Sequence, residues 1–195
     1  NISPANAQPF VLGRRLHHTD FGTGMHSEPG NPEYTEITGK LGSHFAGRSC
    51  SSCHVNNGRA VPPEIGAPMT NYLVRVGSDS NGTPHPQLGA TLQSQSTTGN
   101  PEATVTISGW EETGGRYEDG VPFRLRKPIY KFTGVTPAYF SIRIAPPLIG
   151  MGLLEAISED SIQQFATLPP PSGGHIRTVI DPIDGKQRMG RFGWK

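Results

Sequence analysis

The two cysteines of this 195-residue chain lie in the pentapeptide Cys50-Ser51-Ser52-Cys53-His54. On a helix, positions i, i+3 and i+4 project from one face, so two thiols and an imidazole would lie together. Two thiols in this arrangement can add across the two vinyl groups of a haem, and the imidazole can bind the iron from one side. This is the C-x-x-C-H pattern of c-type haem attachment. It predicts covalent haem on Cys50 and Cys53, with His54 as the proximal iron ligand.

Two other kinds of site use closely spaced cysteines. A redox disulfide of the thioredoxin type has the same spacing, but it normally begins a helix within a βαβ pattern. No such pattern surrounds Cys50. A structural zinc site needs about four ligands, usually in two pairs, and the chain has no second cysteine pair. The histidine directly after Cys53 therefore favours haem over a disulfide or zinc.

The other face of the predicted iron decides its chemistry. A second histidine or methionine ligand gives a low-spin electron-transfer haem, whereas an open position admits peroxide. His17 and His18, which precede the motif, are candidates both for this position and for contacts with a propionate or the backbone. The sequence leaves the ligand open among Met25, Met69, Met151, Met189, His17, His18, His26, His44, His85 and His175.

The composition predicts a loop-rich protein rather than a compact helical bundle. Hydrophobic residues make up 33% of the chain, which has 25 glycines and 19 prolines, and so much turn chemistry indicates long ordered loops. An apolar haem would supply part of the core. The net charge is +1, with both signs interspersed, so the chain lacks a nucleic-acid footprint. It has no run of 18 apolar residues, which predicts no membrane span.

Three helices are expected. The first covers residues 10–20. The second begins near Lys40 or Ser49, carries the haem motif and ends by residues 56–58. The third follows Ser158, which is a good N-cap with two acidic residues in the first turn, and it stops at the prolines of residues 169–171.

Between these helical segments the apolar pattern changes to that of strands. Residues 72–76, 103–107 and 123–126 are expected strands, the last two with period-two alternation. The third strand can continue through residues 129–132, which would put Pro128 at an edge or bulge. Glycine-rich turns at 77–89 and 114–120 separate them. The pattern predicts an antiparallel β insertion.

Several segments resemble one family, the bacterial di-haem oxidoreductases, which are peroxidase-like and thiol-oxidoreductase-like proteins distantly related to di-haem cytochrome c peroxidase and MauG. The resemblance spans nearly the whole chain and keeps the family's order. The matching segments are Gly13-Arg14-Arg15-Leu16, His18-Thr19-Asp20-Phe21, residues 45–59, Arg124-Leu125-Arg126-Lys127-Pro128, residues 145–150, residues 152–157 and residues 190–195.

The resemblance implies an α+β fold in which a cytochrome c-like helical haem core contains an antiparallel β insertion. Residues 1–69 would form the first part of the core, residues 70–145 the insertion, and residues 146–195 the return to the core. Members of the family are longer and carry a second C-x-x-C-H in their C-terminal half. This chain is therefore expected to be an N-terminal part, continuing beyond Lys195, of a protein with two haems.

The resemblance also implies a function and further site residues. It implies one-electron redox chemistry, with hydrogen peroxide as a substrate and electrons exchanged with a second haem domain or a donor cytochrome. Met151 lies in a segment that, by the resemblance, packs near the haem, and it is a candidate distal ligand or an apolar residue that fills the core. Glu155 is a candidate distal acid or a solvated carboxylate of a helix. Trp194 is a candidate electron-transfer aromatic between haems or an ordinary buried aromatic. The alternative is a six-coordinate electron carrier in a multi-haem assembly.

Three arginines are candidate partners of haem propionates, because guanidinium binds carboxylate through two parallel hydrogen bonds. They are Arg48, Arg59 and Arg191. Since haem is attached to C-x-x-C-H outside the bacterial cytoplasm, the motif also predicts a periplasmic or extracellular protein.

Overall fold

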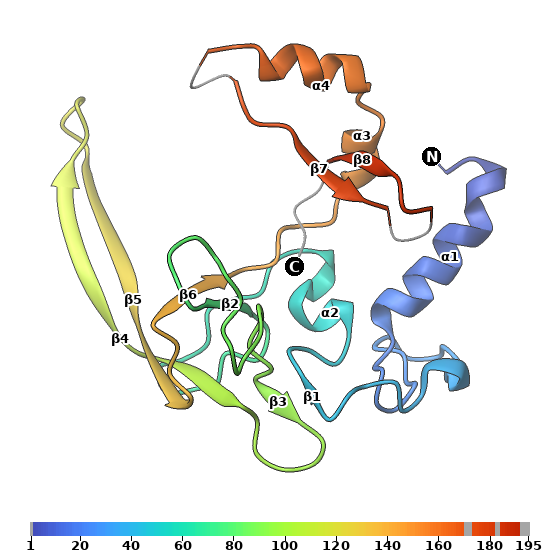
Figure 1. The fold of residues 1–195 in the computed structure, drawn as a ribbon, viewed down its shortest axis with the longest axis horizontal. Coiled ribbons are helices and arrows are strands. Elements are labelled where there is room, and N and C mark those ends of the chain that lie inside the picture. The colour runs from blue at the N-terminus through green and yellow to red at the C-terminus, as the bar shows by residue number, and fades with distance from the viewer. Residues whose placement is uncertain (1, 170–172, 182–183, 192–195) are drawn as a thin grey trace. The chain divides into compact units, whose positions relative to one another are not determined.

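The computed structural model describes residues 2–169, 173–181 and 184–191. It combines helices and strands, which confirms the mixed α and β class, and it divides into two compact units, residues 1–147 and 148–195 (Figure 1). Each unit is described by itself. In the described part of the chain, no helix is both long enough and apolar enough to cross a membrane.

The first unit begins with helix α1, Pro4–His18. Pro4 stands at the start of the helix, where its missing N–H leaves no bond unmade. The helix begins earlier than residue 10 and continues through Pro9, although a proline there removes one intrahelical hydrogen bond. It ends in a basic last turn, which complements the negative end of the helix dipole.

Both cysteines of the C-x-x-C-H motif lie on helix α2, Cys50–Cys53, and His54 follows as its C-cap. A short 3-10 helix, η2 (Val55–Asn57), follows, and within it Asn56 and Asn57 have left-handed φ values of 52° and 59°. Asparagine tolerates this conformation better than most residues. The helical segment therefore ends at the predicted place. Before α2 lie the 3-10 helix η1 (Thr35–Ile37) and the two-residue strand β1 (His44–Phe45), which pairs with β3 (Gln95–Ser96).

The core of the first unit is built on two antiparallel pairs. Strand β2 (Leu73–Gly77) pairs with β6 (Tyr139–Arg143), and β4 (Ala103–Arg116) pairs with β5 (Pro122–Gly134). Alternate residues of β2 and of the first half of β4 are buried, as strand geometry requires. The buried apolar cluster consists of Ala60, Met69, Tyr72, Val74, Val76, Leu88, Leu92, Ala103, Val105 and Ile107.

The hairpin of β4 and β5 is longer than the sequence pattern predicts. Its strands extend as a two-stranded ribbon well past the buried half (Figure 1). As expected, β5 continues past Pro128, which pairs with Trp110 just beyond a bulge between Ile107 and Gly109. The predicted turn at 114–120 is shorter, because β4 continues to Arg116. Gly115 lies against the ring of Phe123, where a Cβ would collide.

The second unit contains two short helices and a hairpin. Helix α3 covers Met151–Glu155, α4 covers Glu159–Ala166, and β7 (Arg177–Ile180) pairs with β8 (Gln187–Gly190). Ser158 caps α4 as predicted, its side chain accepting a hydrogen bond from the Ser161 N–H. None of the described residues of this unit is buried.

Candidate functional site

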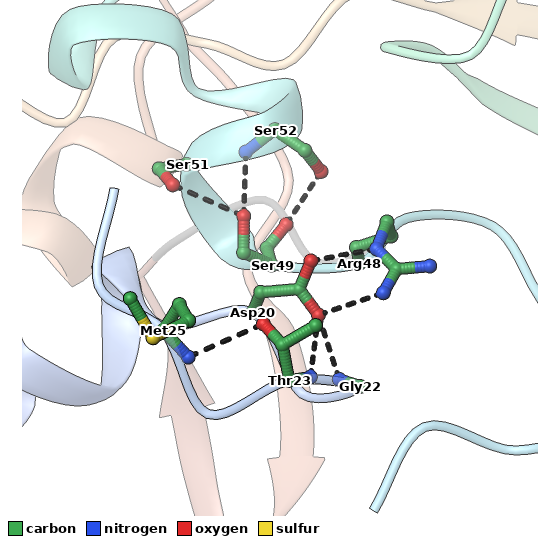
Figure 2. Close-up of polar contacts among 8 residues, drawn as sticks. All are labelled: Asp20, Gly22, Thr23, Met25, Arg48, Ser49, Ser51 and Ser52. Carbon is green, nitrogen blue, oxygen red and sulfur yellow. Dashed lines mark hydrogen bonds and ion pairs between the residues drawn. The ribbon is translucent and has the colours of Figure 1, made fainter. Parts of the chain in front are cut away.

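The C-x-x-C-H motif is held in one helical turn by the serine that precedes it. Ser49 Oγ accepts a hydrogen bond from the Ser52 N–H at 3.1 Å, and Ser52 Oγ donates to the Ser49 carbonyl at 2.6 Å. Figure 2 shows both bonds, with Ser51 Oγ a further 3.0 Å from Ser49 Oγ. An N-cap of this kind satisfies a backbone donor that the helix cannot. It fixes a turn in which the His54 N–H reaches the Cys50 carbonyl at 3.0 Å.

Both cysteines are half-buried free thiols. Gly47 packs against the same turn, where a Cβ would come within 2.9 Å of Ser52 Oγ and 3.6 Å of Cys53 Sγ. A side chain at residue 47 would therefore displace the Ser52 hydroxyl, whereas its contact with Cys53 Sγ would be an ordinary van der Waals contact. The two thiols are not joined as a disulfide in this structure.

His54 is buried, with 4% of its surface exposed, and its ring is fixed from a distant part of the chain. Nδ1 lies 2.9 Å from the carbonyl oxygen of Pro146. A carbonyl only accepts, so Nδ1 carries the proton and Nε2 carries the lone pair. Histidines that bind metals are commonly oriented in this way, by donating the other ring N–H to a backbone carbonyl.

An ion pair ties the end of α1 to the segment before α2. Arg48 Nε donates to Asp20 Oδ2 at 2.6 Å, and Arg48 Nη2 donates to Asp20 Oδ1 at 3.1 Å (Figure 2). The backbone adds a bond from the Phe21 N–H to the Arg48 carbonyl at 3.0 Å. Asp20 Oδ1 also accepts from the N–H groups of Gly22 and Thr23. The guanidinium of Arg48 is thus already engaged by a carboxylate of the protein.

This environment sets the charge of Asp20. Partial burial alone would raise the pKa of its carboxyl, but the hydrogen bonds from Arg48, Gly22 and Thr23 outweigh it, so the pKa is lowered. The same contact raises the pKa of Arg48. Asp20 is therefore a stable anion that anchors the start of the motif segment.

Three further histidines gather beside the motif. The ring of His17 lies 6.1 Å from that of His54, centroid to centroid, and 5.0 Å from that of His18. His18 stacks on His26 at 5.2 Å and forms a hydrogen bond through Nδ1 with Ser27 Oγ at 3.0 Å. Burial lowers the pKa of His18, with Glu28 opposing the shift and Arg14 and His26 adding to it. Burial of His18 therefore favours its neutral imidazole.

The turn of residues 20–25 brings His26 back onto α1. Thr19 pairs with His26 as an isolated antiparallel bridge, and the Ser27 N–H donates to the His18 carbonyl. The sequence shows these histidines as separate candidates, because no local periodicity links residue 26 to residue 18. The available signal was the Asp20-Phe21-Gly22 turn, which closes the helix and reverses the chain.

The other predicted site residues lie elsewhere. Arg59 is exposed, after η2. Met151 begins α3 and is half-buried, whereas Glu155 ends α3 and is exposed. Arg191 donates to the Ile157 carbonyl and lies 4.0 Å from the Glu159 carboxylate, all within the second unit. The roles of these four residues stay predictions, and Trp194 lies outside the described residues.

Several candidates for the sixth iron position have other structural roles. Met69 is buried in the β core, and Met25 is 54% exposed. His85 accepts hydrogen bonds from the N–H groups of Gln87 and Leu88. His44 is exposed beside Ser43. His17, by contrast, has a ring contact with His54.

Over residues 2–169, 173–181 and 184–191, no group of three or more His, Cys, Asp or Glu side chains is arranged to hold a metal ion. A site built from protein ligands alone, such as structural zinc, would need such a group. A haem iron takes four nitrogen ligands from its porphyrin and needs only one or two from the protein. The donors present, two thiols and one oriented imidazole, fit a c-type haem.

Comparison of the chain with protein-family models, with curated proteins and with solved structures found no match.

Proposed function

We propose that this chain is a c-type haem protein that exchanges single electrons. Cys50 and Cys53 hold the haem covalently, and His54 binds its iron as the proximal ligand. The proposal places the protein outside the bacterial cytoplasm, where this attachment is made. It includes the cytochrome c-like character of the helical part around α1 and α2.

The observation that carries the proposal is the hydrogen bond from His54 Nδ1 to the Pro146 carbonyl, 2.9 Å long. It fixes the tautomer with the lone pair on Nε2 and prevents rotation of the ring. Donation to a carbonyl also makes Nε2 a stronger ligand. A histidine that merely follows a redox disulfide has no need of this arrangement.

The cysteines support the same proposal. Ser49 caps the short turn that carries both half-buried thiols, and His54 follows directly after it. This one turn would hold a haem through two thioether bonds and the bond from His54 to its iron. When bound, the haem supplies one-electron chemistry at its iron, while the protein sets the axial ligand and its orientation.

Apolar surface on α1 supports a bound macrocycle. Helix α1 contacts α2 and leaves Leu12 and Leu16 47% and 41% exposed. Large apolar side chains on a helix normally face a core. A haem at α2 would supply apolar surface for this helix to cover.

The resemblance to di-haem oxidoreductases supports a partner that exchanges electrons with this haem. It is a donor cytochrome or a second haem domain, including a C-terminal part of the same protein. The resemblance also supports hydrogen peroxide as the substrate, with Glu155, Met151 and Trp194 in the roles given above. The oriented His54 serves a peroxidase and an electron carrier equally, so peroxide reduction rests on the resemblance alone.

The test is expression in a bacterial periplasm that has c-type haem maturation. We expect covalent haem in stoichiometric amount, measured by the pyridine haemochrome spectrum after denaturation. The Cys50→Ala/Cys53→Ala variant should lose covalent haem, and Ser51→Ala, which changes a spacer residue of the motif, should keep it. Wild-type protein without covalent haem would refute the proposal.

A further inference from the structure

The distance between the His17 and His54 rings suggests which residue binds the iron on the side opposite His54. Their ring centroids lie 6.1 Å apart, with an angle of 48° between the ring planes. Imidazole nitrogens bind first-row metals at about 2.0–2.1 Å, so two imidazoles on opposite sides of one ion have centroids roughly 6–6.5 Å apart. The observed separation lies within this range.

The position of His17 is fixed by contacts on both sides of it. Thr19 Oγ1 donates to the Arg15 carbonyl at 2.7 Å and its N–H reaches the Leu16 carbonyl, which closes the last turn of α1. One residue further, Asp20 is held by Arg48. The ion pair of Asp20 and Arg48 therefore links the end of α1, which carries His17, to the start of α2, which precedes His54.

His18 and His26 make their contacts with each other and with the turn that follows α1. His18 is buried against His26 and bound through Nδ1 to Ser27. His26 Nδ1 accepts a hydrogen bond from the Glu28 N–H. These two rings support the last turn of α1, whereas His17 is the histidine of the cluster for which a ring separation near 6 Å from His54 is observed.

We propose that His17, in place of the Met151 that the resemblance suggests, is the second axial ligand of the iron that His54 binds. The inference rests on the proposed function and deepens it. It makes the haem six-coordinate and low-spin, as suits electron transfer. Peroxide would then reach the iron only after His17 leaves it.

The test compares wild-type protein with His17→Ala, His17→Met and the control His44→Ala, which removes an exposed histidine. Haem content tests the proposed function, and electron paramagnetic resonance and absorption spectra test the ligand. Wild type and H44A should show a low-spin bis-histidine spectrum and no rapid binding of carbon monoxide. H17A should become high-spin and bind carbon monoxide, and added imidazole should restore the low-spin spectrum.

The His17→Met variant distinguishes loss of an iron ligand from loss of the folded structure. With haem content unchanged, it should introduce a methionine–iron charge-transfer band in the oxidised protein. Haem-loaded wild type that is high-spin would overturn the axial assignment and leave the proposed function standing. H17A with an unchanged low-spin spectrum would also overturn it. Absence of covalent haem from wild type would overturn both.

Discussion

His54 donates its Nδ1–H to the carbonyl oxygen of Pro146 across 2.9 Å, although the two residues are 92 positions apart. The contact joins the short helix of the motif to the segment that follows β6. Because the acceptor is a backbone carbonyl, a substitution at residue 146 does not remove it. The orientation of the imidazole is thus set by the fold of the first unit, with the β region between the two residues.

The ion pair of Asp20 and Arg48 is expected to stabilise this unit. Asp20→Asn should lower the free energy of unfolding by about 1 kcal/mol, because it loses a two-bond contact that is only partly exposed. The control is Glu112→Gln, which breaks the highly exposed pair with Arg124 and should cost less than about 0.5 kcal/mol. Urea denaturation measures both. Equal losses would show that the Asp20 contact has no special role.

The lowered pKa of the Asp20 carboxyl predicts that the free energy of unfolding depends on pH in the acid range. Because the folded state lowers the pKa of Asp20 below 3.8, its contribution is complete above that value and is lost as pH falls through the folded pKa. Asp20→Asn should therefore unfold with a flatter pH dependence than wild type in this acid range. Urea midpoints across the range test this, and parallel curves for the two proteins would contradict it.

Gly22 is a position where a side chain would disturb the ion pair of Asp20 and Arg48. A Cβ there would lie 2.5 Å from Nη2 of Arg48 and 3.1 Å from Asp20 Oδ1, so Gly22→Ala should displace the guanidinium and cost about 1 kcal/mol through the weakened pair. Gly13→Ala is the matched control. Gly13 lies in α1 with open space around it, and alanine there should stabilise by roughly 0.5–1 kcal/mol. Thermal unfolding should shift in opposite directions; a loss of stability in G13A would contradict this.

Ser49, the N-cap of α2, is expected to stabilise the helix by accepting a hydrogen bond rather than by donating one. Ser49→Ala removes the acceptor for the Ser52 N–H and should cost about 1 kcal/mol. Ser49→Asp keeps an acceptor at this position and should recover most of the loss. Chemical denaturation of the two variants compares them. An S49D variant as unstable as S49A would exclude the capping role.

Local patterns were enough to predict the mixed fold class, the helix of the motif and three of the strands. Alternation of apolar residues revealed β2 and the buried half of β4, since one face of each packs on the core. It could not reveal β6 or the pair β7 and β8, whose residues are mostly exposed and show no such alternation.

Some parts of the candidate site could be predicted from the sequence, and others depend on tertiary structure. Spacing alone identified Cys50, Cys53 and His54. The Pro146 carbonyl was not predictable, because a backbone acceptor has no residue signature and lies far along the chain. The approach of His26 to His18 also depends on tertiary structure, in this case on the turn held by Asp20.

Covalent haem at the motif is the central claim, and a digest with trypsin tests it most directly. Cleavage after Arg48 and Arg59 releases residues 49–59, which contain both cysteines and His54. For protein matured in a bacterial periplasm, mass spectrometry should find this peptide heavier by one haem, with both thiols blocked to alkylation. The same peptide without haem, carrying two alkylated cysteines or an internal disulfide, would contradict the account.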